Sequence, residues 1–159
     1  MLGKHRARGE GILDSSIEIL TTPHRDDLDL VRIANGSGLS VSVLPTGAIF
    51  AIEHNEANRR IVVNQTLALP IANGMARLYL RVGGSTPTIL SLMGPETPLR
   101  VGASDDRYVW EGEQSGVGHR VTLWLHPRLN AWFWRVEIVN RRDEELPCDA
   151  VLIQTVDTQ

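Results

Sequence analysis

The residue types that most often bind metals or carry catalysis are scattered along this chain of 159 residues. None of the five histidines stands in the HxH or HExxH spacing that directs two imidazoles at one metal ion. His119 and His126 fall at opposite ends of one predicted strand, roughly 23 Å apart at 3.3 Å per residue, so they cannot share a site within that strand. The sequence therefore predicts no metal site and no cofactor.

Carboxylates occur in groups at Asp26–Asp27, Asp105–Asp106 and Asp143–Glu145, all in predicted turns. Two carboxylates that meet across a cleft can perform acid–base chemistry on a glycosidic bond. Aspartates are also common in turns, because their side chains bond nearby backbone N–H groups. The serines form no GxSxG motif, and the stretch RVGGSTPT lacks the lysine of a phosphate-binding loop. We therefore assign no catalytic residue.

Two of the four tryptophans belong to an apolar stripe near the end of the sequence. Trp132 and Trp134 share one face of a predicted strand with Val136 and Ile138. A period-2 apolar face is what the interior of a β-sandwich requires. We therefore predict that this stripe belongs to the core.

The other two tryptophans are the candidate binding residues. Trp124 lies on the polar face of its predicted strand, with Thr122 and His126, and Trp110 shares a face with Tyr108. An exposed tryptophan beside polar groups can stack on a sugar ring or lie in a protein interface, and the alternative is packing beneath a second layer. We predict Trp110 and Trp124 as substrate-binding residues.

Composition narrows the class of protein. Hydrophobic residues make up 42% of the chain and charged residues 22%, which is typical of one globular domain. The net charge of −3 argues against nucleic-acid binding. A single cysteine, Cys148, fits a reducing compartment, and neither a membrane-spanning apolar run nor a signal peptide is evident. We expect a cytoplasmic protein without membrane or nucleic-acid partners.

Alternating apolar and polar residues, interrupted by turn signals every 8–12 residues, predict an all-β, antiparallel sandwich or barrel. A short N-terminal helix is expected at Ile12–Leu20, and Gly94–Asp106 reads as a long loop. The domain boundaries that follow are a tail over 1–27 and a β-sandwich over 28–159, with the last two strands forming a hairpin. The predicted strands are Leu28–Ile33, Leu39–Leu44, Ala48–His54, Arg60–Gln65, Met75–Val82, Thr88–Met93, Arg107–Glu113, Arg120–His126, Ala131–Asn140 and Ala150–Val156.

Three runs of sequence together resemble a known family. They are LVRIANGSGLSVSVLPTGAIFAIEHNEANRRIVVNQ, NGMARLYLRV and YVWEGEQSGVGHRVTLWLHPRLNAWFWRVEIVNRRDEEL. In combination they are similar to the N-terminal β-domain of inverting glycoside phosphorylases of glycoside hydrolase family 94, the cellobiose phosphorylase and β-1,2-oligoglucan phosphorylase type. No single motif carries the likeness, which covers most of Leu28–Gln159.

The resemblance implies a supersandwich of the galactose-mutarotase type, belonging to a fragment of a larger cytoplasmic enzyme. It implies that an (α/α)6 barrel in the missing C-terminal part holds the catalytic residues, so this chain alone is inactive. The parent would be a glycosyltransferase acting with inorganic phosphate on β-linked glucosides. This domain would wall one side of the site for a β-glucan or oligosaccharide and mediate a homodimer. The alternatives are a stand-alone carbohydrate-binding module and a structural dimerisation domain.

Overall fold

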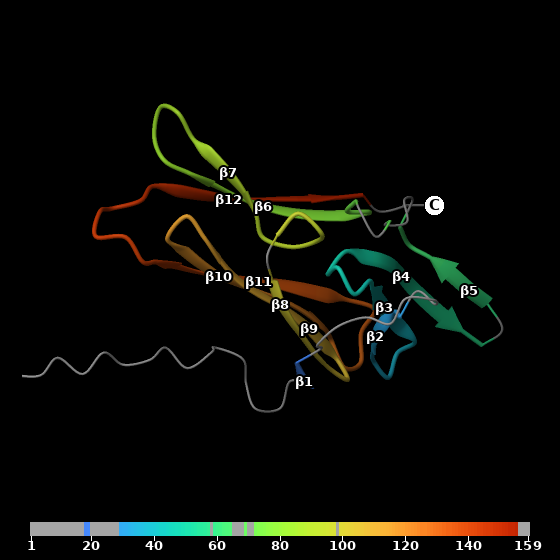
Figure 1. Ribbon diagram of the computed structural model, residues 1–159. Coiled ribbons are helices and arrows are strands. Elements are labelled where there is room, and N and C mark those ends of the chain that lie inside the picture. The colour runs from blue at the N-terminus through green and yellow to red at the C-terminus, as the bar shows by residue number, and fades with distance from the viewer. Residues whose placement is uncertain are drawn as a thin grey trace, which may run out of the picture.

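The computed structural model describes residues 18–19, 29–57, 59–64, 69, 72–97 and 99–155. Within these ranges every named element is a β-strand, and every pairing between strands is antiparallel (Figure 1). The strands form three sheets, of five, three and four strands. The prediction of an all-β, antiparallel, sandwich-like fold is confirmed.

The five-stranded sheet has the order β1-β8-β9-β10-β11. Its strands are β1 (Glu18–Ile19), β8 (Leu99–Ser104), β9 (Arg107–Gln114), β10 (Val117–Leu125) and β11 (Trp132–Asn140). Strand β10 shows why these residues form a half-covered sheet: Val121, Leu123 and Leu125 are fully buried, while Thr122 and Trp124 between them are partly exposed. Alternation of this kind turns one face of a strand to the core and the other away from it.

The three-stranded sheet, in the order β12-β6-β7, lies over the apolar face of the first (Figure 1). It consists of β6 (Ala76–Val82), β7 (Thr88–Ser91) and β12 (Cys148–Gln154). In β6, Leu78 and Leu80 point into the core, whereas Arg77 and Arg81 point outward. Side chains of both sheets belong to one buried cluster, which makes the pair a sandwich.

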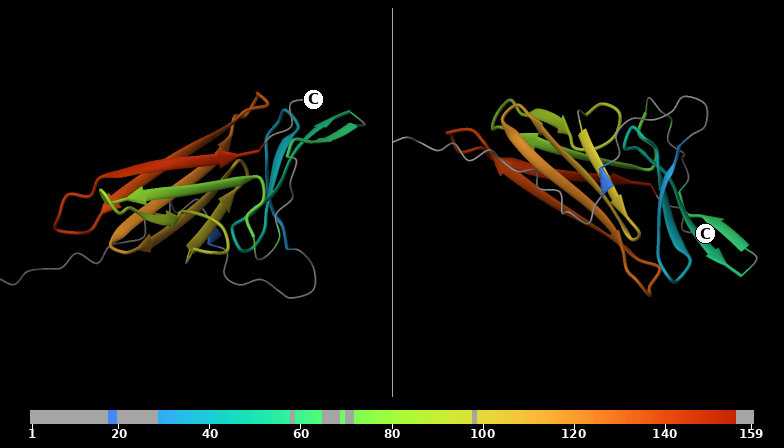
Figure 2. Two further views of the ribbon diagram at one scale, coloured as in Figure 1. Left: turned by 90° about the horizontal axis from the view of Figure 1, so that it is seen from above. Right: turned by 60° about the horizontal axis from the view of Figure 1, so that its bottom comes forward.

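The four-stranded sheet, in the order β2-β3-β4-β5, stands across one end of this sandwich (Figure 2). It consists of β2 (Val31–Ala34), β3 (Leu39–Val43), β4 (Ile49–Glu56) and β5 (Arg59–Val62). Leu39, Val41 and Val43 of β3 are buried in the common core. Asn35 fixes the position of this sheet, because its side-chain amide donates to the carbonyl oxygens of His126 (2.6 Å) and Leu129 (2.9 Å) in the β10–β11 turn.

A second tie between the four-stranded sheet and the sandwich is the side chain of Trp110. The indole N–H of Trp110 donates to the carbonyl oxygen of Gly47 at 2.7 Å, and the whole residue is 0% exposed. Gly47 lies in the β3–β4 turn with a φ of +80°, and its amide donates to the Leu44 carbonyl. This left-handed backbone favours glycine, and the missing side chain leaves room for the indole.

Strand β8 is an element that the sequence did not reveal. The prediction of one long loop over Gly94–Asp106 is wrong, because Leu99–Ser104 pair along β9 without a register shift. Leu99, Val101 and Ala103 alternate toward the core, but flanking Pro95 and an internal glycine hid that pattern. The predicted helix Ile12–Leu20 lies mostly outside the described residues, and Glu18–Ile19 within it form strand β1, paired with β8.

The predicted hairpin between the last two strands is also wrong. Strand β11 pairs with β10 in the five-stranded sheet, and β12 pairs with β6 in the three-stranded sheet. The loop over 141–147 therefore crosses from one sheet to the other (Figure 1). Leu152 lies opposite Leu78 in the register, so β12 extends the second layer of the sandwich.

We predict that Gly47→Ala strongly destabilises the fold. A Cβ at this position would lie 2.8 Å from Nε1 and 3.0 Å from Cδ1 of Trp110, and the left-handed backbone alone costs about 1–2 kcal/mol for a residue with a Cβ. Gly83→Ala is the matched control, because Gly83 has a φ of +98° and its added Cβ would meet no atom nearer than 3.7 Å. Urea unfolding should show a loss of about 1–2 kcal/mol for Gly83→Ala, from the backbone alone, and a clearly larger loss for Gly47→Ala. Equal effects would contradict the anchoring role of Trp110.

Candidate functional site

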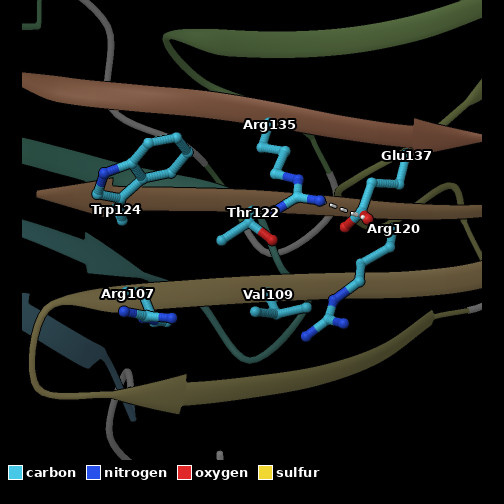
Figure 3. A pocket seen from close by; sticks show the side chains of 7 residues that line it. All are labelled: Arg107, Val109, Arg120, Thr122, Trp124, Arg135 and Glu137. Atoms are coloured by element: carbon cyan, nitrogen blue, oxygen red, sulfur yellow. Dashed lines mark hydrogen bonds and ion pairs between the residues drawn. The ribbon is translucent and has the colours of Figure 1, made fainter. Parts of the chain in front are cut away.

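The outer face of the five-stranded sheet carries a hollow of about 300 Å³, drawn in Figure 3. We call this surface the arginine face. Strands β9, β10 and β11 each contribute to it because every second residue of a strand points to the same side of a sheet. The arginine face is lined by Arg107, Val109, Arg120, Thr122, Trp124, Arg135 and Glu137.

The charges of the arginine face are largely matched by nearby carboxylates. Arg135 forms an ion pair with Glu137 at 2.9 Å, and Arg107 forms one with Asp106 at 3.3 Å. Arg120 lies between two glutamates in the register, opposite Glu137 on β11 and opposite a residue of the same type on β9. Cross-strand pairs of opposite charge stabilise a sheet by a few tenths of a kcal/mol to about 1 kcal/mol each. The balanced ladder therefore makes a polar surface rather than a concentrated anion site.

Aromatic side chains border this ladder at the end near the β10–β11 turn. The rings of Trp124 and Phe133 are stacked at a centroid distance of 5.2 Å, and His126 lies 6.4 Å from Phe133. Phe133 is 41% exposed. Stacked aromatic rings beside arginines are typical of contact surfaces, but here they also bury one another.

The two predicted binding residues lie on opposite faces of the sheet. Trp124 lines the arginine face, as its predicted strand pattern indicated. Trp110 lies in the core with Tyr108, at a ring-centroid distance of 4.6 Å, and its only polar atom is bonded to Gly47. The structure therefore does not bring Trp110 and Trp124 into one site. A role for either in substrate binding stays a prediction.

Two of the buried titratable side chains in the described part of the chain, His119 and Tyr108, have pKa values shifted by burial. Burial lowers the pKa of His119 below its usual 6.5, and a hydrogen bond to the Leu92 backbone opposes that shift. Its Nε2 atom has no hydrogen-bond partner among the described residues. Burial raises the pKa of Tyr108, so its hydroxyl stays protonated over the ordinary pH range. Both groups are neutral at pH 7, which is what an apolar interior favours.

A different exposed surface is apolar and runs along β12. Its central residues Val151, Leu152 and Ile153 are 44%, 44% and 49% exposed. Leu152 points to the same side as Leu78, its register partner on β6, yet Leu78 is only 2% exposed. Among the described strands β12 is an edge of the three-stranded sheet, and its core-facing Leu152 stays 44% exposed, so the core is open along this edge.

The neighbouring strand of the other layer completes this opening. Trp132, Trp134, Val136 and Ile138 of β11 turn toward the core but are only partly buried. The indole N–H of Trp134 donates to the side-chain oxygen of Gln154 at 3.2 Å, which joins β11 to β12 across the opening. We call the surface formed by Val151–Ile153 and the four partly buried β11 residues the open side. The prediction that this tryptophan stripe packs on the core is confirmed.

Sequence reasoning missed the open side. Alternation predicts which face of a strand is apolar, but it does not show which strand lies at the edge of a sheet. A usable signal was present in the run of three apolar residues, Val151, Leu152 and Ile153. Three consecutive apolar residues need cover on both faces of a strand, whereas a half-exposed strand alternates.

Comparison with known families gives a match over most of the chain. Residues 42–158 match the family described as the SOGP N-terminal domain. The chain belongs to this family. The match of the SOGP N-terminal domain begins within β3 and runs through β12, so it includes both the arginine face and the open side. A search of curated proteins finds no match.

Membership in the SOGP N-terminal domain family overturns several expectations. The family shown is not glycoside hydrolase family 94, so the resemblance to its phosphorylases is corrected. The roles inferred from that resemblance, as a glycoside phosphorylase domain and as a wall of a sugar site, have no support in the match or the structure. The same holds for the carbohydrate-binding module, the (α/α)6 barrel, the homodimer and the β-glucan partner.

Two features are absent from the residues that the structure describes. No helix there has the length and apolar character needed to cross a membrane. No three His, Cys, Asp or Glu side chains come together there in an arrangement that could hold a metal ion.

We predict that His119 makes the fold less stable as the pH falls from 7.5 to 5.5. The unfolded chain takes up a proton at this residue near pH 6.5, whereas burial keeps the folded residue neutral to lower pH. The free energy of unfolding should therefore drop below pH 6.5, by at most about 1.4 kcal/mol per pH unit, until the folded residue also protonates.

The test compares His119→Leu with His126→Leu by urea unfolding at several pH values. His119→Leu should flatten the decline over this pH range, and His126→Leu, in the turn after the same strand, should leave it in place. A decline that survives in His119→Leu would show that other groups cause it.

Proposed function

We propose that this SOGP N-terminal domain is an interaction and scaffolding domain, which docks through its open side onto the C-terminal part of a longer polypeptide. The domain corresponds to residues 28–159, within which the family match falls. The observation that carries this proposal is the exposure of Val151, Leu152 and Ile153 on a strand at the border of the core. The family description, an N-terminal domain, supports further chain after it.

The open side has the chemistry of a surface that becomes buried. Trp132 and Trp134 pack against the core but are only partly buried, and Trp134 bonds Gln154 of β12; tryptophan is enriched where interfaces are fully desolvated. Covering an aliphatic side chain completely contributes about 1.5–3 kcal/mol. The half-exposed residues of the open side can therefore supply several kcal/mol to docking.

The arginine face is less suited to this role. Its guanidinium groups already meet carboxylates within the same sheet, as in the ion pair of Arg135 with Glu137. A partner would have to replace these contacts and the water around them, which leaves little net gain. The open side requires no such exchange, since its exposed atoms are mostly apolar.

A cytoplasmic location is part of the proposal. Cys148, the single cysteine of the chain, is exposed at the start of β12. An exposed free thiol is suited to a reducing compartment, where oxidation is held in check.

The test measures the effect of the same side-chain truncation in two proteins: the chain 1–159 and the longer polypeptide that this proposal expects. Leu152→Ala should destabilise the longer polypeptide by at least about 1 kcal/mol more than it destabilises the chain 1–159, because Leu152 is buried further only in the longer one. Ile89→Ala is the matched control, on β7 at the opposite edge of the same sheet and 57% exposed. It should have the same small effect in both contexts.

Two outcomes would contradict the proposal. One is an equal effect of Leu152→Ala in both contexts, as measured by chemical unfolding monitored through tryptophan fluorescence. The other is a natural reading frame that stops at Gln159, since no C-terminal part would then exist to dock.

A further inference from the structure

We infer that the occupant of the open side is a β-strand of the C-terminal part of the polypeptide, which pairs with the free edge of β12. This inference rests on the proposed function and adds the mode of binding. A strand that joins the edge of a sheet gains affinity from backbone hydrogen bonds and specificity from alternating side chains.

The geometry of β12 suits strand addition. Its seven residues pair with β6 in an unbroken register from Cys148↔Val82 to Gln154↔Ala76. Within the described part of the chain, β12 has no partner on its other side. An unbroken register leaves the free edge regular, so alternate N–H and C=O groups project from it at even spacing.

The edge of β12 also lacks the features that usually block strand addition. Natural edge strands are protected by lysine, proline, bulges, inward-pointing charges or short length. β12 contains no lysine or proline and shows no register shift, and its single charged residue is Asp149 near its start. Asp149 points outward, where it forms an ion pair with Arg81.

The other edge strands of the structure do carry such protection. β7, the opposite edge of the same sheet, has four residues and follows Pro87. β5 has four residues and begins with two arginines, while β2 has four residues and β1 has two. β11 carries Arg135 and Glu137. The edge of β12 is therefore the long, unprotected one among the described strands.

A strand fits this surface better than a helix does. Ala150 and Leu152 point to the core side of the sheet, and Val151 and Ile153 point to its outer side. A helix laid on one face would leave the other set exposed. A neighbouring strand places side chains on both faces at once, and its core-facing residues would also cover the partly buried Trp134 of β11.

The primary experiment is hydrogen exchange of the β12 amides, compared between the chain 1–159 and the longer natural polypeptide. In the chain 1–159, alternate amides are bonded to β6 and the others face the free edge. Strand addition should slow exchange of the second set by at least about 100-fold in the longer polypeptide, in line with incorporation into a stable sheet. The first set should already be protected in both.

A pair of proline variants tests the same geometry without relying on exchange rates. The amides of Val151 and Leu152 point to opposite sides of β12, so one faces β6 and the other faces the free edge. In the chain 1–159, proline should be much more damaging at the position facing β6. In the longer polypeptide, the second position should become comparably sensitive, because its N–H then donates to the added strand.

The outcomes separate the mode of binding from the docking itself. If Leu152→Ala shows the extra cost in the longer polypeptide but the edge amides stay unprotected, docking occurs without a strand and this inference is overturned. If neither effect appears, both proposals fail. If the edge amides of the chain 1–159 become protected with increasing concentration, the occupant is a second copy and the inference is again overturned.

Discussion

The hydrogen bond from the Trp110 indole to the Gly47 carbonyl is the contact on which the arrangement of the sheets depends most. It is fully buried, so breaking it would leave an N–H group without a partner in the core, at a cost of about 1–3 kcal/mol. It also joins residues 63 positions apart, one in a tight turn of the four-stranded sheet and one in the middle of the sandwich. The β3–β4 turn directs the Gly47 carbonyl at Trp110 because Gly47 adopts a left-handed conformation. The geometry of this turn and the packing of Trp110 in the core therefore depend on each other.

From this bond a line of aromatic contacts leads to the open side. The ring of Trp110 lies 5.8 Å from that of Trp134, and Trp134 in turn bonds Gln154 of β12. The edge strand is thus held by the core as well as by its pairing with β6. This tie explains how β12 can keep an extended form although most of its side chains are exposed. A pre-ordered edge lowers the entropy that a docking strand must overcome.

Alternation along the sequence predicted most of the strands, because burial on one side of a sheet imposes a period of two. It placed Trp110 on one face of its strand with Tyr108, and Trp124 on one face of the next strand with Thr122, but it did not show that these faces lie on opposite sides of the sheet, which only the register reveals. It missed β8, where Gly102 interrupts the pattern.

Alternation could not predict which strands pair with each other. Strands β11 and β12 are close in sequence, and the sequence therefore predicted that they pair as a hairpin. The choice of β6 as the partner of β12 depends on Leu78 and Leu80 some seventy positions earlier. The contact between Trp110 and Gly47 is equally remote in sequence. The pairing of strands that are distant in sequence depends on how well their complete apolar faces pack together, and no local sequence pattern predicts that fit.

The arginine face and the open side differ in how far their own residues supply one another with ion-pair, hydrogen-bond and apolar contacts. On the arginine face, Arg135 forms an ion pair with Glu137 of the same strand, and Trp124 stacks on Phe133. The charged and aromatic groups of this surface therefore already contact one another. On the open side, Leu152 and Trp132 expose apolar area that no neighbouring strand in the described part of the chain covers, and backbone groups along β12 face outward. A sheet edge gains both hydrogen bonds and apolar burial from a further strand, whereas a balanced charge ladder gains little from any partner. The free energy available for binding is therefore concentrated at β12.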